Sequence, residues 1–329
     1  MIKNISIENF KSIKNLSFEA RRVNIFIGEP NTGKSNVLEA LGLYSSVYVE
    51  NLKDIIRFGY ANNLFFLNSI KETVKVILDD RELLLGQGDF FHKTEGLRID
   101  INEGKNRVSK KGYSVDGSQI IKDETDLTSG NHNVKFFKFK VLDKYSSGKF
   151  QFLYPPHGDN LFEIITTNEH LLEIVKGIFK QKGFKLFIDS VRRSIGIVLD
   201  DKSDFLNFLP YEVISDTLQR VIFYLAAMLS NKNSALIFEE PESHIFPFYN
   251  QYLAETIGLD EESGNQYFIA THNPYFLGSI AQKTKIEDLA VFITYMENHE
   301  TKLRQLREDE YPELFDFDIF YNLDRFIEA

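Results

Sequence analysis

The chain has 329 residues, of which 43% are apolar and 14% aromatic, enough to pack the core of one large α/β domain or two smaller ones. The formal net charge of −10 argues against a uniform attractive field for nucleic acid, and the absence of cysteine excludes disulfides and thiolate metal sites. No signal-peptide segment and no apolar run of about 18 residues occur, so the sequence predicts a soluble, cytoplasmic protein without a membrane partner.

The first half of the chain predicts strands, one helix and then more strands. Alternating patterns in "MIKNISIENF" and "SIKNLSFEA" indicate paired strands, and the apolar run in "RRVNIFI" indicates a strand buried on both faces. A helix is expected from Gly33 onward. Short alternating pieces separated by turn residues predict small antiparallel strands from about 55 to 150.

The second half predicts helices around two further buried strands. "NEHLLEIVKGIFKQKG" has the periodicity of an amphipathic helix, "FKLFIDSVRRSIGIVLDD" suggests a hairpin, and "DTLQRVIFYLAAMLS" an apolar helix that Ser215 could cap. "SALIFEE" and "NQYFIATHN" read as buried strands that end in polar residues, and "LAVFITY" with "TKLRQL" as a closing hairpin.

The segment between the third strand and the first helix matches the phosphate-binding loop pattern G-x-x-x-x-G-K-[ST]. In such a loop, backbone N–H groups at a helix N-terminus surround phosphate oxygens, the lysine reaches the β- and γ-phosphates, and the serine ligates Mg²⁺. The predicted nucleotide-binding residues are Gly28, Glu29, Pro30, Asn31, Thr32, Gly33, Lys34, Ser35 and Asn36.

Two later strand ends supply the remaining catalytic groups. In "ALIFEEPE", Glu239 is expected to join Ser35 in the metal shell, and Glu240 is expected to polarise the attacking water. In "FIATHNP", His272 follows the next strand and could bond the γ-phosphate or the water. All three sites fall at carboxyl ends of strands, where open α/β sheets bind ligands. Solvated carboxylates and a surface histidine are the structural alternatives.

The order of these motifs resembles the ABC-type ATPase heads of the SMC/RecF group. "ISIENFKSIKNLSF" followed by "IFIGEPNTGKSNVLEAL" resembles the opening of that group, and "LIFEEPESHIFP" with "FIATHNPYFL" resembles the OLD-type ATPases of the AAA family. The resemblance implies an α/β P-loop fold with a mixed central sheet, an antiparallel β insertion and a helical lobe. Lobe I would comprise about 1–150 plus 231–329, and lobe II about 151–230.

The resemblance also implies ATP and Mg²⁺ as cofactors and a homodimer, or a higher oligomer, in which ATP lies between two heads. Ser215 in "ISDTLQR" would be the signature serine, acting on ATP held by the other protomer. The family has Ser-x-Gly there, whereas this chain has Asp216 and Thr217, which puts ATP-driven closure in question; a plain helix cap is the alternative.

Three functions follow from these observations. The leading prediction is an ATP hydrolase that acts as a nucleotide-gated dimeric switch for a separate protein effector, in DNA repair or anti-phage defence. The alternative is a nucleotide-dependent sensor with negligible turnover. An intrinsic nuclease is disfavoured, because the 57 residues after His272 leave no room for a Toprim domain and no second acidic cluster is present.

A nucleic-acid partner stays open on weaker grounds. "KFFKFKVLDKYSSGKF" interleaves Lys135, Lys138, Lys140 and Lys144 with phenylalanine, a pattern that could stack bases and bind phosphates. A strand with a solvated lysine side is the favoured interpretation of the same pattern.

Overall fold

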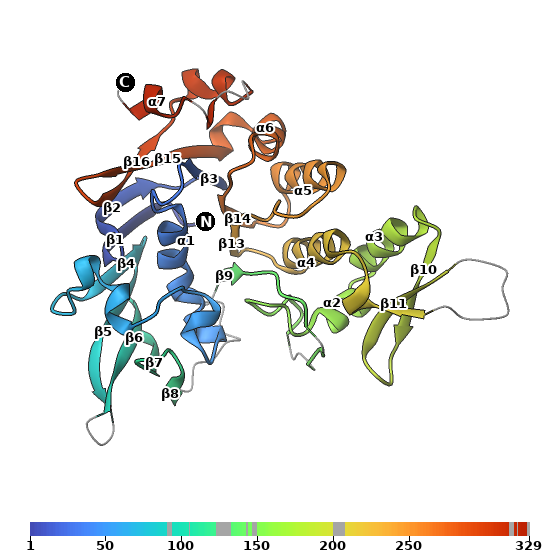
Figure 1. Ribbon diagram of the computed structural model, residues 1–329, viewed down its shortest axis with the longest axis horizontal. Helices are drawn as coiled ribbons and strands as arrows, with labels where there is room; N and C mark the ends of the chain where they lie inside the picture. Colours follow the sequence, from blue (N-terminus) through green and yellow to red (C-terminus); the bar gives the residue numbers. More distant parts are fainter. Residues whose placement is uncertain are drawn as a thin grey trace.

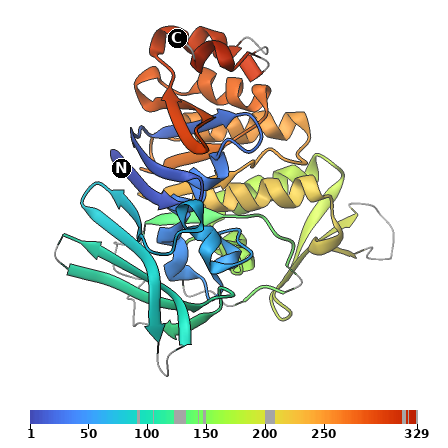
Figure 2. The same ribbon diagram turned by 60° about the vertical axis from the view of Figure 1, so that its left-hand side comes forward.

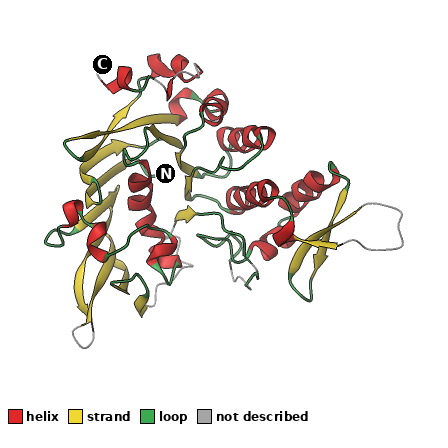
Figure 3. Ribbon diagram, viewed as in Figure 1, coloured by secondary structure: helices red, strands yellow, loops and turns green. Residues whose placement is uncertain are grey.

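In a computed structural model, the described part of the chain contains three β-sheets and the helices around them (Figure 1). In Figure 3, helices cover the central sheet while the antiparallel insertion at the lower left consists mainly of strands. No helix in the described part is both long and apolar enough to cross a membrane. The structure describes residues 1–90, 94–104, 106–122, 133–142, 144–146, 150–199, 208–315, 319–320 and 322–327.

The central sheet is mixed, with four parallel pairings and one antiparallel hairpin at its edge. Parallel strands must be covered on both faces, and the sequences "VNIFIG" and "QYFIA" are accordingly buried at every position. In spatial order its strands are β16 (Glu300–Gln305), β15 (Leu289–Glu297), β3 (Val23–Gly28), β14 (Gln266–Ala270), β13 (Ala235–Glu239) and β9 (Val134–Phe137).

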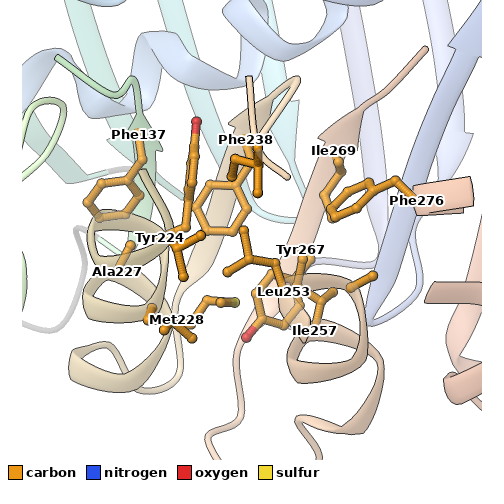
Figure 4. Close-up of a cluster of buried hydrophobic side chains, with 14 of the residues drawn as sticks. Phe137, Tyr224, Ala227, Met228, Phe238, Leu253, Ile257, Tyr267, Ile269 and Phe276 are labelled. Atoms are coloured by element: carbon orange, nitrogen blue, oxygen red, sulfur yellow. The ribbon is translucent and has the colours of Figure 1, made fainter. Parts of the chain in front are cut away.

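The two faces of this sheet bury different sets of side chains. Ile25 and Ile27 of β3 belong to one core cluster, whereas Phe26 between them belongs to the other, as the period of two requires. Figure 4 shows the first cluster, where Tyr224 and Met228 pack with Phe238. Helix α1 (Lys34–Gly42) covers the second face, while α4 (Asp216–Ser230), α5 (Pro247–Leu259) and α6 (Pro274–Lys283) cover the first.

The antiparallel insertion is a second, larger sheet that begins with the N-terminal hairpin (Figure 2). Its strands in spatial order are β2 (Ile13–Glu19), β1 (Asn4–Phe10), β4 (Val74–Leu78), β5 (Arg81–Phe90), β6 (Thr94–Glu103), β7 (Asn106–Ser114) and β8 (Gln119–Lys122). The expectation of small antiparallel strands from about 55 to 150 was wrong at both ends, because β9 pairs in parallel with β13 in the central sheet and the first part lacks long strands. Residues 43–68 contain the 3₁₀ turns η1 (Leu43–Tyr48), η2 (Leu52–Asp54), η3 (Ala61–Leu64) and η4 (Phe66–Asn68) instead.

A helical region with a small sheet projects from the other side, at the right of Figure 1. Helix α3 buries Leu171, Val175 and Phe179 along one stripe, so its amphipathic pattern is confirmed. The predicted hairpin is β10 with β11, and β12 completes the sheet. The elements are α2 (Leu161–Thr167), α3 (Glu169–Lys180), β10 (Phe184–Asp189), β11 (Ser194–Leu199), β12 (Phe208–Pro210) and η5 (Tyr211–Val213).

The chain closes with η6 (Ile286–Asp288), the β15–β16 hairpin, η7 (Glu308–Phe315) and α7 (Asp324–Ile327). Tyr311 and Leu314 of η7 are buried, and the η7 segment packs against α6. The expected mixed sheet, antiparallel insertion and helical lobe are all present, so the predicted fold class is confirmed.

Candidate nucleotide-binding site

The loop from Gly28 to Gly33 joins the end of β3 to the start of α1, as the phosphate-loop pattern predicts. Gly33 has φ of 98°, a left-handed conformation that favours glycine, and a Cβ there would lie 2.0 Å from Thr301 Oγ1. Gly28 faces the same constraint, because its Cβ would lie 2.5 Å from the Thr294 carbonyl oxygen. The loop is therefore shaped by close backbone contacts with the β15–β16 hairpin.

Lys34 is buried beneath this loop and folds back onto it. Its Nζ donates to the carbonyl oxygens of Gly28 at 2.8 Å and Glu29 at 2.7 Å. Desolvation lowers the pKa of Lys34 to about 8, and the nearby carboxylates of Glu240 and Glu29 only partly offset this effect. An anion in the loop would compensate a cation that is poorly solvated in its absence.

The other predicted loop residues divide into an exposed tip and a base whose side chains are hydrogen-bonded. Glu29, Pro30 and Asn31 are exposed, and Ser35 is half-buried at the helix start. At the base, Thr32 Oγ1 donates to the Glu29 carbonyl oxygen at 2.8 Å and lies 2.6 Å from Thr294 Oγ1. The nucleotide contacts of all these residues stay predictions.

The side chain of Asn36 is already engaged within the protein. Its Nδ2 donates to Ser12 Oγ at 2.6 Å, and Ser12 Oγ lies 2.7 Å from Thr301 Oγ1. A role for Asn36 at the nucleotide would therefore fall to its backbone N–H at the start of α1, one of the unpaired helix-end donors.

Glu239, the predicted metal ligand, ends β13 and pairs with an arginine that the sequence analysis did not single out. Arg57 Nη2 donates to Glu239 Oε1 at 3.0 Å, while Arg57 Nε donates to Glu39 Oε1 at 2.9 Å. Glu39 is fully buried on α1 and also pairs with Lys11. The Glu239 carboxylate therefore lies in a charge network that includes α1.

Glu240 and His272, the predicted catalytic pair, come together from neighbouring strand ends. His272 Nε2 lies 3.6 Å from Glu240 Oε1, and both side chains are over 40% exposed. Glu240 has φ of 44°, which turns the backbone off the line of β13, and its N–H donates to the Ala270 carbonyl oxygen at 2.9 Å. Desolvation and the charge of Lys34 lower the pKa of His272, so the imidazole is neutral at pH 7.

A third carboxyl, Glu242, was not predicted and lies buried just behind this pair. Its Oε1 accepts a hydrogen bond from Thr271 Oγ1 at 2.5 Å, and no described residue donates to its Oε2. Burial raises the pKa of Glu242 to about 7. Glu242 therefore links the loop that carries Glu240 to the loop that carries His272. Its only sequence signal was its place two residues after Glu240.

Ser215, the predicted signature serine, is exposed at the N-terminus of α4, but its side chain makes no capping hydrogen bond. The expectation that Ser215 caps the helix by its hydroxyl was wrong. Asp216 lies next to Ser215, and its carboxylate would repel a phosphate bound there. This repulsion is reduced, because Arg220 Nε donates to Asp216 Oδ2 at 2.7 Å. Thr217 Oγ1 donates to the His244 carbonyl oxygen at 3.0 Å, joining α4 to the Glu240 loop.

A groove of about 820 Å³ is lined by residues 11–12 and by residues between Lys53 and Asn68. Ser12 and Arg57 line it, and both reach residues of the candidate site, Asn36 and Glu239 respectively. Phe58 and Phe65 add apolar surface to its wall. The sequence analysis missed this groove, since its residues come from separate segments.

Among the described lysines of the lysine-rich segment, Lys135 does not face solvent. Lys135 is buried in β9, where its Nζ donates to Asn231 Oδ1 at 2.5 Å and lies 3.5 Å from the centre of the Phe152 ring. Desolvation lowers the pKa of Lys135 to about 7. Both interpretations were therefore wrong for Lys135, which neither faces nucleic acid nor is solvated, because its ammonium group is buried against Asn231 and Phe152.

These features define a P-loop ATPase head of the ABC type, with the phosphate loop, the acidic strand and the histidine at one edge of the central sheet. The chain belongs to the family described as "AAA domain, putative AbiEii toxin, Type IV TA system", whose model matches residues 23–278. The predicted resemblance to SMC-like heads is confirmed, while the narrower resemblance to OLD-type ATPases stays a prediction.

Two known sequences are similar to this chain. An ATP/GTP phosphatase of Helicobacter pylori is 24% identical over 354 residues, covering 94% of this chain and 93% of that protein. An uncharacterized protein of Methanocaldococcus jannaschii is 30% identical over 163 residues, covering 44% of this chain and 74% of that protein.

Two solved structures share the fold over nearly their whole length. The SMC head bound to the C-winged helix domain of ScpA has a TM-score of 0.55 at 15% identity, covering 94% of this chain and 99% of that one. The Pyrococcus furiosus SMC head bound to the C-terminal domain of ScpA has a TM-score of 0.52 at 12% identity, covering 96% and 98%.

Proposed function

We propose that the chain hydrolyses ATP as a nucleotide-gated switch, in which two heads close on ATP and signal to a separate protein. The observation that carries the proposal is that Lys34, Glu240 and His272, which follow three neighbouring strands, come together at the phosphate loop. A lysine can hold the phosphates, a carboxylate can orient the attacking water, and an imidazole N–H can donate to the γ-phosphate.

The proposed reaction is attack of water on the γ-phosphorus, forming one P–O bond and breaking the bond to the β,γ-bridging oxygen to give ADP and phosphate. Glu240 orients the water and accepts its proton. Neutral His272, held 3.6 Å from Glu240, donates a hydrogen bond to a γ-phosphate oxygen. Lys34 exchanges its two carbonyl partners for phosphate oxygens.

The residues at the loop fit a magnesium ion by their donor chemistry. A serine hydroxyl on Ser35 and a carboxylate on Glu239 are the oxygen ligands that Mg²⁺ prefers alongside phosphates. The ion would neutralise charge on the β- and γ-phosphates. The base and ribose are proposed to lie in the groove lined by Ser12, Arg57 and Phe58.

Dimer closure is proposed from the position of Ser215. Its hydroxyl is exposed, unengaged in capping, and placed at the positive end of a 15-residue helix, so it is free to meet a phosphate on a second head. The two SMC heads named above are each described as bound to ScpA, which supports a separate protein partner here. The mention of the AbiEii toxin in the family description favours anti-phage defence over DNA repair.

A sensor with negligible turnover is the second candidate. Thr217 occupies the position where relatives have glycine, and its bond to the His244 carbonyl oxygen fixes the start of α4 against the Glu240 loop. A fixed signature helix would bind nucleotide without completing the catalytic dimer.

Glu240→Gln tests both candidates. The amide keeps the shape of the side chain but cannot accept the proton, so we expect phosphate release to fall by about 10²–10⁴-fold with ATP affinity retained. Light scattering should then show a doubled mass with ATP and Mg²⁺ but not with ADP. Glu173→Gln on exposed α3 is the matched control and should behave as wild type. Hydrolysis by Glu240→Gln at the wild-type rate would refute the catalytic assignment, and slow hydrolysis without a mass gain would refute the dimeric switch.

A further inference from the structure

A second groove lies between helices α5 and α6, outside the nucleotide site. It encloses about 580 Å³, within the usual range for ligand sites of roughly 300–1,000 Å³. Both helices follow strands that carry catalytic residues, and they lie side by side in Figure 1. The groove is lined by Pro247, Asn250 and Gln251 of α5, the α6 segment residues Asn273, Tyr275, Gly278, Ser279 and Gln282, and Phe315 of η7.

Asn250 at this groove holds a hydrogen-bond acceptor that the described residues leave unfilled. The residue is 92% buried, its Nδ2 donates to the Ile245 carbonyl oxygen at 3.3 Å, and no described group donates to its Oδ1. A buried polar atom without a partner costs free energy, so native structures rarely keep one without a reason. Because Oδ1 itself is closed to solvent, an N–H or O–H donor in the groove would satisfy it once the Asn250 side chain turns toward the groove.

The lining has the chemistry of a peptide site rather than of an anion site. It contains no Lys, Arg, His, Asp or Glu among its nine residues, and the chain as a whole carries a net charge of −10, so phosphate-bearing ligands find no cation there. Amide side chains can both donate to and accept from a peptide backbone. Tyr275 and Phe315, each half or more exposed, offer aromatic surface to an apolar side chain.

Hydrogen bonds and chain connections also link the groove to the candidate nucleotide site. Asn273 directly follows His272, and its N–H donates to Thr271 Oγ1 at 3.0 Å, whose hydroxyl donates to Glu242. Pro247 opens α5 immediately after the loop that begins at Glu240. Movement of either catalytic loop would therefore change the walls of the groove.

We propose that this groove binds an uncharged, extended peptide segment of a separate protein partner, with a backbone N–H on Asn250 Oδ1 and a large apolar side chain against Tyr275 and Phe315. The inference rests on the proposed function, because it names the surface through which the ATP-driven switch reaches its effector. A second copy of this chain is a less suitable occupant, because in a two-fold symmetric contact the groove of one copy would face the groove of the other. A concave groove needs a protruding element to fill it. A peptide of another protein meets that need, with affinity that depends on the bound nucleotide.

Gly278 offers a substitution that blocks the groove without disturbing the fold. A Cβ at Gly278 would meet only the Leu314 carbonyl oxygen, at 3.9 Å, and replacing a helical glycine raises helix propensity. Gly278→Leu should therefore fold and fill the groove. Gly177→Leu in α3 is the matched control, since a Cβ there meets nothing within 4 Å and α3 lies in the helical lobe. Asn250→Leu removes the acceptor itself and gives a second, independent variant.

The probe is a phage-displayed library of random 12-residue peptides, selected on the full chain with ATP and Mg²⁺. We expect enrichment of uncharged peptides with an aromatic or large aliphatic residue. Fluorescence anisotropy of a selected peptide should give a Kd that rises at least about tenfold in Gly278→Leu and Asn250→Leu but stays unchanged in Gly177→Leu. The Kd should also differ between the ATP and nucleotide-free states of the wild type.

Several outcomes would overturn the inference. They are the absence of any enriched peptide, a selected peptide that binds Gly278→Leu as tightly as wild type, and a Kd that nucleotide leaves unchanged. If no peptide is enriched and Gly278→Leu loses the ATP-dependent dimer, the groove binds a second copy of the chain, and the inference is refuted. A failure of the proposed function can be distinguished from a failure of this inference. In that case wild type and Lys34→Ala would have equal ATP affinity in a calorimetric titration, independently of the peptide results.

Discussion

Replacing Glu242 by glutamine should change how the stability of the protein depends on pH. Glu242 is 6% exposed and links the loops that carry Glu240 and His272, with one oxygen on Thr271 and the other without a donor among the described residues. Desolvation dominates its environment and outweighs the hydrogen bond from Thr271, so the folded protein favours the protonated carboxyl and the pKa rises to about 7.

The sign and size of the effect follow from linkage. The folded-state pKa of about 7 lies above the value of 4.5 that the unfolded chain would have, so the contribution to stability is fully present below the unfolded pKa and is lost as pH rises through the folded pKa. Between pH 5 and pH 8 the free energy of unfolding should therefore fall by about 2–3 kcal/mol through this one group.

Urea denaturation of the nucleotide-free protein at pH 5, 6, 7 and 8 measures this difference. Glutamine does not titrate, so Glu242→Gln should lose this part of the pH slope, while every other titrating group contributes equally to both proteins. The variant should gain stability relative to wild type as pH rises. Parallel pH profiles for the two proteins would refute the burial argument and leave Glu242 as an ordinary ionised carboxylate.

Three further changes test the site. Lys34→Ala should abolish ATP binding in a calorimetric titration and keep the circular dichroism of the fold, because it removes a charge-assisted phosphate contact, whereas the exposed Lys14→Ala should leave affinity unchanged. Arg57→Ala should lower the free energy of unfolding in urea by about 1–2 kcal/mol, since buried Glu39 loses the Arg57 side chain and keeps Lys11 and the backbone N–H of residue 57. Gly33→Ala should lose stability, measured in the same way, by at least about 1 kcal/mol more than Gly104→Ala, because both residues have positive φ but only the Cβ at Gly33 meets a neighbour.

The sequence predicted the phosphate loop and the main sheet because their signals are local. The phosphate loop has two glycines separated by four residues and followed by lysine and serine, and it lies between a buried strand and a helix. This pattern can be identified from the segment alone, without knowledge of the rest of the fold. The apolar runs of β13 and β14 likewise predicted strands buried on both faces, and both lie in the central sheet next to β3 or one strand further out.

What the sequence did not predict depends on contacts between distant segments. Arg57 and Glu239 are 182 positions apart, and nothing near either residue indicates their pairing. Lys135 looked solvated because lysine in a strand usually is, yet Asn231 and Phe152 enclose its ammonium group. Glu242 looked like one more surface acid until the fold placed it against Thr271.

The central claim is that ATP is hydrolysed between two heads. Mixing two inactive variants tests this claim most directly. Lys34→Ala cannot bind ATP in its own loop, and Ser215→Arg cannot offer its signature serine to a partner. In a mixed dimer, the intact loop of one chain meets the intact Ser215 of the other, so phosphate release should recover to about a quarter of the wild-type rate at equal amounts. Two inactive variants that stay inactive when mixed, or a Ser215→Arg variant with wild-type activity alone, would contradict the shared site.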